Sequence, residues 1–334
     1  MSTHQVPVIE IKSILPHPNA DKLEIVEVQG WRTCIRKGDF QVGDKAIWIE
    51  PDYLVDTKRP EFAFLASVAK RDDKARIKVK KLRGEISQGL LIPLPEQLKD
   101  VQIGDDLYEA LGIERYEPDV HIGTGGQSTK GPPGIYVVKY DVENFNSYRD
   151  KVLPYFEGQE IVVQEKLNGA NCRFVFCSED QKFYIGSRTM WKDSSGDNIW
   201  TRLCEQYPSI ELWCREHPDH ILCGEVFGTV GGMKYGASPG QLFFAAFDVM
   251  KDGKWLDWAN FYDMTLGKVT IAPIRDLQPF NEKWLRELAE YDSAWPGAKH
   301  LSEGIVFKLK KELEVHRLGR MQYKIVSNRY LEKD

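Results

Sequence analysis

Short runs in which apolar and polar residues alternate dominate the first third of the chain. Glycine, proline and aspartate interrupt these runs, as they do between the strands of a sheet. The strand-like runs cover residues 6–11, 23–28, 31–36, 45–49, 75–82 and 88–92. Five or six short strands with little helical periodicity predict a small closed β-barrel.

The rest of the chain mixes strand-like and helical spacing. Its strand-like runs cover residues 160–164, 173–176, 183–185, 220–222, 242–249, 304–308 and 322–326. Helical spacing is clearest over residues 200–216 and 282–291. The mixture predicts an α+β fold that is built on antiparallel sheets.

A segment rich in glycine, proline, serine and threonine separates these two parts. It covers residues 117–134 and cannot bury apolar surface, so it predicts a linker or mobile loop. A chain of 334 residues also exceeds what one hydrophobic core usually serves. We therefore expect one domain over residues 1–116, for which the OB-fold is a common nucleic-acid-binding barrel, and a second domain over residues 135–334.

Composition and charge indicate which partners the chain can bind and in which compartment it is expected. Its formal net charge is −5, so any contact with nucleic acid requires a local basic surface. The six cysteines include no closely spaced pair, which favours reduced thiols over disulfides or a zinc site. The N-terminus lacks the regions of a signal peptide, and no apolar run approaches the roughly 20 residues of a membrane span. We expect a soluble, cytoplasmic protein that does not contact membranes.

Eight basic residues between positions 70 and 83 are the strongest local candidate for a basic surface. From Arg76 to Lys80 they alternate with Ile77 and Val79, so a strand would carry one cationic and one apolar face. A cationic face suits the phosphates of a nucleic acid. A solvated edge strand that its lysines protect from aggregation explains the same pattern equally well.

The segment with the clearest chemistry spans residues 164–171. Its sequence, Gln-Glu-Lys-Leu-Asn-Gly-Ala-Asn, places Lys166 at the end of a predicted strand and three residues before Gly169. Such a lysine and glycine pair is common by chance, but five further segments follow in order. They are residues 187–189 (Ser-Arg-Thr), 223–228 (Cys-Gly-Glu-Val-Phe-Gly), 243–248 (Phe-Phe-Ala-Ala-Phe-Asp), 302–308 (Ser-Glu-Gly-Ile-Val-Phe-Lys) and 323–327 (Tyr-Lys-Ile-Val-Ser).

This order resembles the collinear motifs of polynucleotide ligases and mRNA capping enzymes, which form the covalent nucleotidyltransferase superfamily. The pattern Glu-Lys-x-x-Gly-x-Asn is most similar to the RNA ligase branch, and the resemblance covers residues 136–330. Residues 17–24 and 81–93 are also similar to the N-terminal OB domain of one RNA ligase family. The resemblance implies an ATP-dependent RNA ligase, in which an OB-fold barrel precedes an α+β adenylyltransferase domain with antiparallel sheets.

The resemblance also implies a role for each motif residue. Lys166 is the nucleophile that becomes adenylylated, and Glu303, Lys308 and Lys324 complete the catalytic set. The residues implied to bind ATP are Glu165 near the adenine, Phe244 stacked on it, Arg188 and Glu225 on the ribose, Asn171 near the phosphates, and Lys308 and Lys324 on the α-phosphate. Glu225 and Glu303 are the implied ligands of Mg²⁺ or Mn²⁺.

The reaction explains why a lysine is needed. Its amine attacks the α-phosphate of ATP only when it is neutral, so we expect burial and nearby cations to lower the pKa of Lys166. Lys308, Lys324 and a bound magnesium ion are the expected cations. The product is a lysyl-AMP phosphoramide. AMP then passes to a 5′-phosphate, and a 3′-hydroxyl displaces it.

Two positions in the motifs leave alternatives open. Aromatic residues in a strand are usually core, so Phe247 competes with Phe244 for the stack on adenine. At Asn168 some relatives with the same N-terminal domain carry an aspartate that binds metal through water. An asparagine does not supply that charge.

The expected substrate is a nicked RNA or RNA/DNA duplex with RNA on the 3′-hydroxyl side, and the expected enzyme is a monomer. DNA ligases and capping enzymes are the nearest rivals, but they normally place an OB domain after the last lysine motif. This chain has ten residues beyond Lys324. A catalytically silent RNA-binding protein is the other rival. It would be expected to have lost Lys166, Glu225, Glu303 or Lys324, and all four are present.

Overall fold

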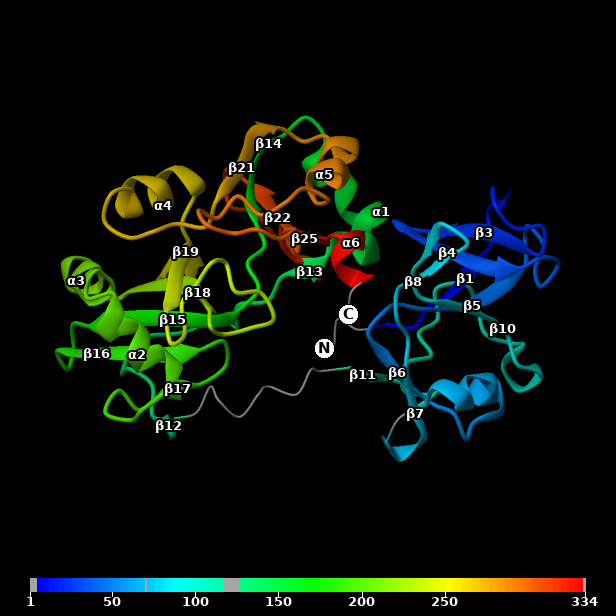
Figure 1. Ribbon diagram of the computed structural model, residues 1–334, viewed down its shortest axis with the longest axis horizontal. Coiled ribbons are helices and arrows are strands. Elements are labelled where there is room, and N and C mark those ends of the chain that lie inside the picture. Colours follow the sequence, from blue (N-terminus) through cyan, green and yellow to red (C-terminus); the bar gives the residue numbers. More distant parts are fainter. Residues whose placement is uncertain (1–4, 70, 117–125, 138, 333–334) are drawn as a thin grey trace. The chain divides into compact units, whose positions relative to one another are not determined.

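The computed structural model describes residues 5–69, 71–116, 126–137 and 139–332. The chain divides into two compact units. Unit 1 comprises Met1–Asp119, Asn146–Arg149 and Leu331–Asp334, and unit 2 comprises Val120–Phe145 and Asp150–Tyr330 (Figure 1). Much of the predicted linker, residues 117–125, lies outside the described residues.

Short antiparallel strands make up unit 1. They form sheets in the orders β1-β5-β10, β2-β3-β4 and β11-β6-β7, and a separate hairpin of β8 and β9. The strands are β1 Val8–Glu10, β2 Ile14–Pro16, β3 Leu23–Val28, β4 Trp31–Arg36, β5 Lys45–Ile49, β6 Tyr53–Asp56, β7 Lys74–Arg76, β8 Lys80–Leu82, β9 Glu85–Ser87, β10 Leu90–Pro93 and β11 Glu114–Arg115. The 3-10 helices are η1 Pro60–Val68, η2 Arg71–Asp73 and η3 Glu96–Leu98.

Strand β5 divides the apolar interior of unit 1 into two cores. Ala46 and Trp48 face one core, whereas Ile47 and Ile49 face the other, as alternate residues of a strand must. This strand is buried on both faces, which explains why its sequence is continuously apolar after Lys45.

The basic segment of unit 1 keeps the predicted alternation but does not form one strand. Ile77 and Val79 are buried, as expected. The single strand predicted over residues 75–82 is wrong, because β7 pairs with β6 whereas β8 pairs with β9.

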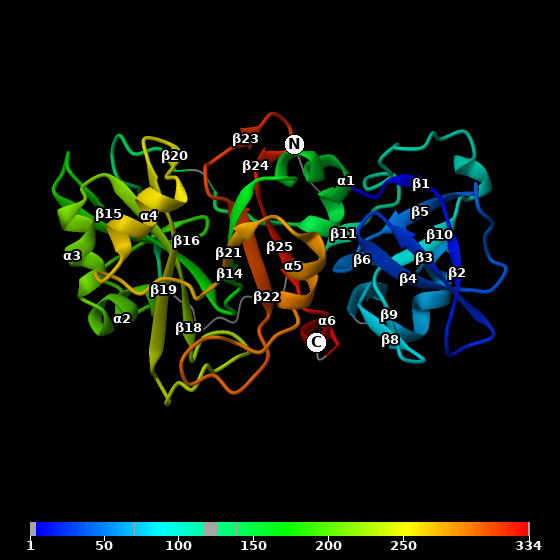
Figure 2. The same ribbon diagram turned by 90° about the horizontal axis from the view of Figure 1, so that it is seen from above.

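Unit 2 contains a seven-stranded and a five-stranded sheet, in the orders β12-β17-β16-β15-β18-β19-β20 and β13-β25-β22-β14-β21. The larger sheet consists of β12 Ser128–Thr129, β15 Ala170–Cys177, β16 Lys182–Ser187, β17 Trp191–Lys192, β18 His220–Gly228, β19 Leu242–Lys251 and β20 Lys254–Trp255. The smaller sheet consists of β13 Glu143–Asn144, β14 Glu160–Glu165, β21 Ile274–Pro279, β22 Gly304–Leu309 and β25 Gln322–Val326, and β23 Glu314–Val315 pairs with β24 Gly319–Arg320. Figure 2 shows β18 beside β19, and β22 between β14 and β25.

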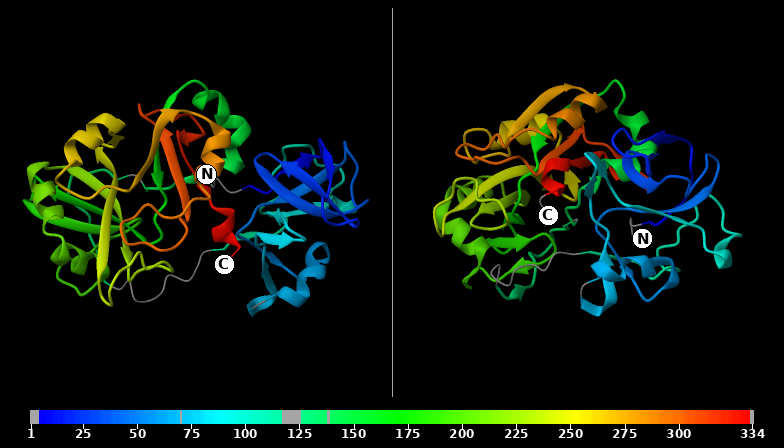
Figure 3. Two further views of the ribbon diagram at one scale, coloured as in Figure 1. Left: turned by 45° about the horizontal axis from the view of Figure 1, so that its top comes forward. Right: turned by 45° about the vertical axis from the view of Figure 1, so that its right-hand side comes forward.

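Helices accompany the two sheets of unit 2, and several of them pack on a sheet face. They are α1 Phe145–Phe156, α2 Ile199–Gln206, α3 Ser209–Glu216, α4 Trp258–Thr265, α5 Glu282–Leu288 and α6 Asn328–Leu331. Trp200 of α2, Trp213 of α3 and Phe261 of α4 share one core with the larger sheet. Phe156 of α1 packs against Phe307 of the smaller sheet at 5.1 Å between ring centroids. In Figure 3 unit 2 is coloured green to red and the sheets of unit 1 blue to cyan.

The long helix predicted over residues 200–216 is wrong. The chain forms α2 and α3 with a break at Tyr207 and Pro208, because proline lacks the N–H that would continue the first helix. The predicted α+β class, with antiparallel sheets and a first unit of short strands, is confirmed. No helix within the described ranges is long and apolar enough to span a membrane.

Candidate active site

Lys166 follows β14 and lies against the start of β22. Its backbone N–H donates to the carbonyl of Gly304 at 2.9 Å. Its side-chain Nζ donates to Glu303 Oε1 at 2.6 Å, although 137 positions separate the two residues in the chain. The side chains are 24% and 12% exposed, so this ion pair lies at the edge of the interior and can be reached from solvent.

Glu225 approaches the same lysine from β18 in the larger sheet. It stands directly opposite Asn171 in the ladder of β15 and β18, and its carboxylate accepts the backbone N–H of Gly169. A Cβ atom on Gly169 would lie 2.2 Å from the carbonyl oxygen of Val226, so a side chain does not fit there. The glycine three positions after Lys166 thus allows the backbone before β15 to lie close against β18 in the same sheet.

Carboxylates dominate the charge around Lys166. Burial lowers the pKa of Lys166. Glu303 and Glu225 together raise it by more than burial lowers it, so the net pKa lies above the ordinary value of a lysine. Burial raises the pKa of Glu225 to about 8, and the charge of Glu303 raises it too, against the opposing effect of Lys166. The pKa of Lys166 is therefore raised in this arrangement because its neighbours are acids, and the low pKa expected beside magnesium stays a prediction.

Asn168 connects the elements around this ion pair. Its Nδ2 donates to Glu303 Oε2 at 3.2 Å and to the Tyr330 hydroxyl at 3.1 Å, and its Oδ1 accepts the N–H of Gly232 at 2.8 Å. Its backbone N–H donates to the Tyr235 hydroxyl at 2.7 Å. Asn168, which lacks the charge of an aspartate, thus positions the Glu303 carboxylate that contacts Lys166.

Asp141 brings together two of the predicted nucleotide-binding cations. Arg188 Nη1 lies 3.6 Å from Asp141 Oδ1. Burial raises the pKa of Asp141, but Lys139, Arg188 and Lys324 lower it more strongly, so its net pKa is below the ordinary value. Sequence reasoning missed this acid because it precedes the motif region and no spacing links it to Lys324.

The side chain of Glu165 does not lie beside that of Lys166, although the two residues are adjacent in the chain. Neighbouring residues of an extended chain point in opposite directions. The Glu165 carboxylate accepts the N–H of Ala294 at 2.7 Å and also contacts Ser293 and Arg275. Its side chain is fully buried in these contacts. The side chain therefore fixes the segment after α5, and its implied contact with adenine stays a prediction.

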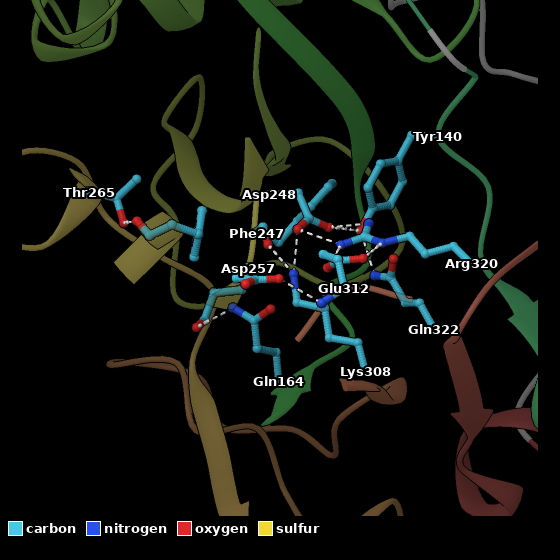
Figure 4. A network of polar contacts seen from close by, with 12 residues as sticks. Tyr140, Gln164, Phe247, Asp248, Asp257, Thr265, Lys308, Glu312, Arg320 and Gln322 are labelled. Carbon is cyan, nitrogen blue, oxygen red and sulfur yellow. Dashed lines mark hydrogen bonds and ion pairs between the residues drawn. The ribbon is translucent and has the colours of Figure 1, made fainter. Parts of the chain in front are cut away.

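Lys308 also lies away from Lys166, in a buried polar network (Figure 4). Its Nζ contacts Asp248 and donates to the carbonyl of Phe247 at 3.2 Å. Arg320 donates to both oxygens of Asp248, at 2.7 and 2.9 Å, and the Tyr140 hydroxyl donates to Asp248 at 2.6 Å. Burial raises the pKa of Asp248, but Arg320 and Lys308 lower it to about 2. Lys308 is thus an internal counter-ion of Asp248 in this structure, and its implied contact with the α-phosphate stays a prediction.

Phe244 and Phe247 lie on opposite faces of β19. Phe244 is buried in the core beneath α2, α3 and α4, where it packs edge-on against Phe174. Phe247 is partly exposed on the other face, and its ring centroid lies 4.7 Å from that of Tyr140. This face also carries Ala245, the cross-strand partner of Glu225. The choice of Phe244 for the stack on a base is therefore wrong, and its competitor Phe247 takes its place in our proposal.

The donor atoms around Lys166 suit a magnesium-like ion. No cluster of three or more His, Cys, Asp or Glu side chains within the described ranges could enclose a metal alone. Mg²⁺ is usually held by one or two carboxylates together with water and substrate phosphates. Glu303 and Glu225 offer two carboxylates. Burial raises the pKa of Glu225, the charge of Glu303 raises it too, and a cation would favour the charged form of both acids.

Comparison with protein families identifies both units. A family model described as an OB-fold domain matches residues 5–94, and one described as RNA ligase matches residues 159–326, which is half of the chain. The chain belongs to the RNA ligase family. The OB-fold expected for the first unit is also confirmed. No curated protein matches the sequence.

Solved structures of Naegleria gruberi RNA ligase share the fold over nearly the whole chain. A mutant with ATP and Mn has a TM-score of 0.85 at 23% identity and covers 99% of both chains. A mutant with AMP and Mn has a TM-score of 0.84 at 23% identity, covering 99% of this chain and 98% of that one. A structure with PPi has a TM-score of 0.83 at 24% identity and covers 98% of both chains.

We predict that Gly169→Ala destabilises unit 2. The added Cβ meets backbone and not a flexible side chain, so the strands must shift at a cost of about 1–3 kcal/mol. Urea unfolding measures this loss. Gly196→Ala is the matched control, because its Cβ would lie 3.6 Å from the nearest atom. Equal stability of the two variants would contradict the close approach.

We predict that Glu303→Gln lowers the pKa of Lys166. The substitution removes the larger of the two charges that raise this pKa, while the opposing effect of burial remains. The pH dependence of Lys166 acetylation, followed by mass spectrometry of its peptide, reports the pKa. At a fixed mildly alkaline pH the variant should therefore react faster. The control is Glu160→Gln, which neutralises an exposed acid paired with Lys310 and should leave the pH profile of Lys166 acetylation unchanged. An unchanged profile in Glu303→Gln would contradict the ion pair of Lys166 with Glu303.

Proposed function

We propose that this protein is an ATP-dependent RNA ligase that joins a 3′-hydroxyl to a 5′-phosphate through a lysyl-AMP intermediate on Lys166. The observation that carries the proposal is the contact of Lys166 Nζ with Glu303, beside Glu225, in a chain of the RNA ligase family. The complexes of Naegleria gruberi RNA ligase with ATP, AMP and Mn support ATP and a divalent metal as cofactors.

Lys166 is the proposed nucleophile of the first step. Its Nζ forms a bond with the α-phosphorus of ATP while the bond to pyrophosphate breaks. Glu303 Oε1, at 2.6 Å, orients the amine and is placed to accept its proton. Asn168 fixes the other oxygen of this carboxylate, so the acceptor keeps its direction. Burial of Lys166 favours its neutral form once the neighbouring acids are neutralised.

Glu225 and Glu303 are the proposed holders of Mg²⁺ or Mn²⁺. A metal bound there would offset the charge of the phosphates and of the leaving pyrophosphate. Arg188 and Lys324 are the proposed contacts to ribose and phosphate, and both act on Asp141 in this structure. We propose that phosphate oxygens replace the carboxylate of Asp141 as their partner. Asn171, opposite Glu225, would lie near the phosphates.

In the second step an oxygen of the 5′-phosphate attacks the phosphorus of lysyl-AMP, and the bond to Lys166 breaks. In the third step the 3′-hydroxyl attacks the 5′-phosphorus and AMP leaves. We propose a nicked RNA or RNA/DNA duplex with RNA on the 3′-hydroxyl side as substrate, and a monomeric enzyme. A cytoplasmic location is proposed because all six cysteines are free thiols, as reducing compartments favour.

We predict that Lys166→Ala abolishes sealing of a nick with an ordinary 5′-phosphate but retains sealing of a nick that already carries 5′-AMP. The nucleophile is needed only to form that intermediate. Gel assays with both nicks, ATP and magnesium measure the two activities. The control is Lys192→Ala, which alters another lysine of unit 2 and should seal both nicks. Sealing of the ordinary nick by Lys166→Ala would refute the proposal.

We predict that Phe247→Leu raises the KM for ATP about tenfold, because stacking of a base on an aromatic ring contributes about 1–3 kcal/mol. The turnover rate at saturating ATP and the stability should change little, since Phe247 is only partly buried. Phe244→Leu is the matched control, and it should lower stability without a selective change in KM. The reverse pattern would return the stack to Phe244.

A further inference from the structure

The turn between β8 and β9 in unit 1 carries an unexpected residue. Leu82 pairs with Glu85, so Arg83 and Gly84 alone form the loop. Both have a positive φ, of 48° and 95°. Two-residue hairpin loops with this backbone favour asparagine, aspartate or glycine at the first position, because other side chains are strained there. Arginine therefore occupies this position against the local conformational preference.

Two side chains from the segment before β3 hold this turn in place. His17 Nδ1 accepts the N–H of Asn19 at 3.1 Å, so Nε2 carries the hydrogen and donates to the carbonyl of Leu82 at 3.0 Å. Asn19 Nδ2 donates to the carbonyl of Arg83 at 3.1 Å. His17 is buried although it is polar. The two stretches that resemble the OB domain of an RNA ligase family are thus hydrogen-bonded to each other. These hydrogen bonds fix the backbone of Arg83.

The side chains at this hairpin form an exposed cationic group. Lys80, Lys81 and Arg83 are all exposed. Lys81 lies 3.4 Å from Glu332, which is part of the same unit. Within the described ranges, no carboxylate forms an ion pair with Lys80 or Arg83. The supported turn therefore presents an exposed guanidinium that pairs with none of the described carboxylates.

We propose that Arg83 binds a backbone phosphate of the polynucleotide substrate, with Lys80 beside it. The guanidinium matches the geometry of phosphate and can donate two hydrogen bonds to it. Backbone strain that the surroundings maintain is often found at sites of function, and here His17 and Asn19 maintain it. This inference rests on the proposed function, because it takes nucleic acid as the partner. It adds a substrate contact in unit 1, which none of the motif residues of unit 2 provides.

The test is Arg83→Asn, which removes the cation and places a residue at position 83 that tolerates positive φ. We expect the free energy of unfolding to stay equal or to rise. Affinity for a nicked RNA duplex with a 5′-phosphate should fall about tenfold, the size of one charge-assisted contact. The slope of log affinity against log salt should become shallower by about 0.9, as for the loss of one phosphate contact. Adenylylation of the protein by ATP should be unchanged.

Three further variants separate the causes. Lys99→Asn removes an exposed cation directly after η3 of the same unit, where it pairs with Glu96, and should leave affinity and salt slope unchanged. Arg83→Lys keeps the charge and should retain most of the salt slope. Asn19→Ala leaves every cation in place and should still weaken nick binding, because it frees the carbonyl of Arg83.

Wild-type affinity and salt slope in Arg83→Asn would overturn the inference, and so would an equal loss in Lys99→Asn. A clear loss of stability in Arg83→Asn would remove the argument from backbone strain. Failure of the wild-type protein to become adenylylated would instead refute the proposed function, since nick binding is measured without any chemistry.

Discussion

Buried charge has to be paired, and in unit 2 this constraint falls on Asp248. The carboxylate is fully buried on β19 of the larger sheet, and its partners Lys308 and Arg320 come from β22 and from the end of β24. Removal of one partner from such a group usually costs several kcal/mol, so the two sheets cannot separate at this point without a large penalty. The same contacts hold the carbonyl of Phe247 and, through Tyr140, its ring. The network therefore fixes one end of β22, whereas its other end lies against Lys166.

At the other end of β22, around Lys166, the negative charge of the side chains exceeds the positive charge. Lys166 sits between two acids that raise its pKa, and one of these acids, Glu225, is itself raised to about 8. A protein that only needed a stable ion pair would not gather a second carboxylate beside it. In the proposed reaction, activation of the amine therefore depends on positive charge that Lys308 does not supply in this structure. We propose that this dependence links formation of the nucleophile to the arrival of the nucleotide with its metal.

Sequence patterns predicted the strands well where runs of apolar and β-branched residues are bounded by turn residues. The predicted bounds are those observed for β3, β4, β5 and β25. The prediction of one helix over residues 200–216 did not take account of Pro208, which separates α2 from α3. The motifs named Lys166, Glu225 and Glu303, and these do lie together. Alternation shows that Phe244 and Phe247 face opposite sides, but not which side faces Glu225. An irregular register of β18 and β19 beside Gly224 also puts Asp248 on the face of Cys223, which no sequence period encodes. The partner of Lys308 lies 60 positions away, so only the fold shows that this lysine is a counter-ion.

The most direct test of this account is to locate AMP on the protein. Wild-type protein is incubated with ATP and magnesium, digested under conditions that preserve the phosphoramide, and its lysine-containing peptides are analysed by mass spectrometry. The account predicts that AMP is attached to Lys166 and that inorganic pyrophosphate removes it. AMP on another residue, or no covalent AMP in protein that still seals nicked RNA, would contradict the central claim.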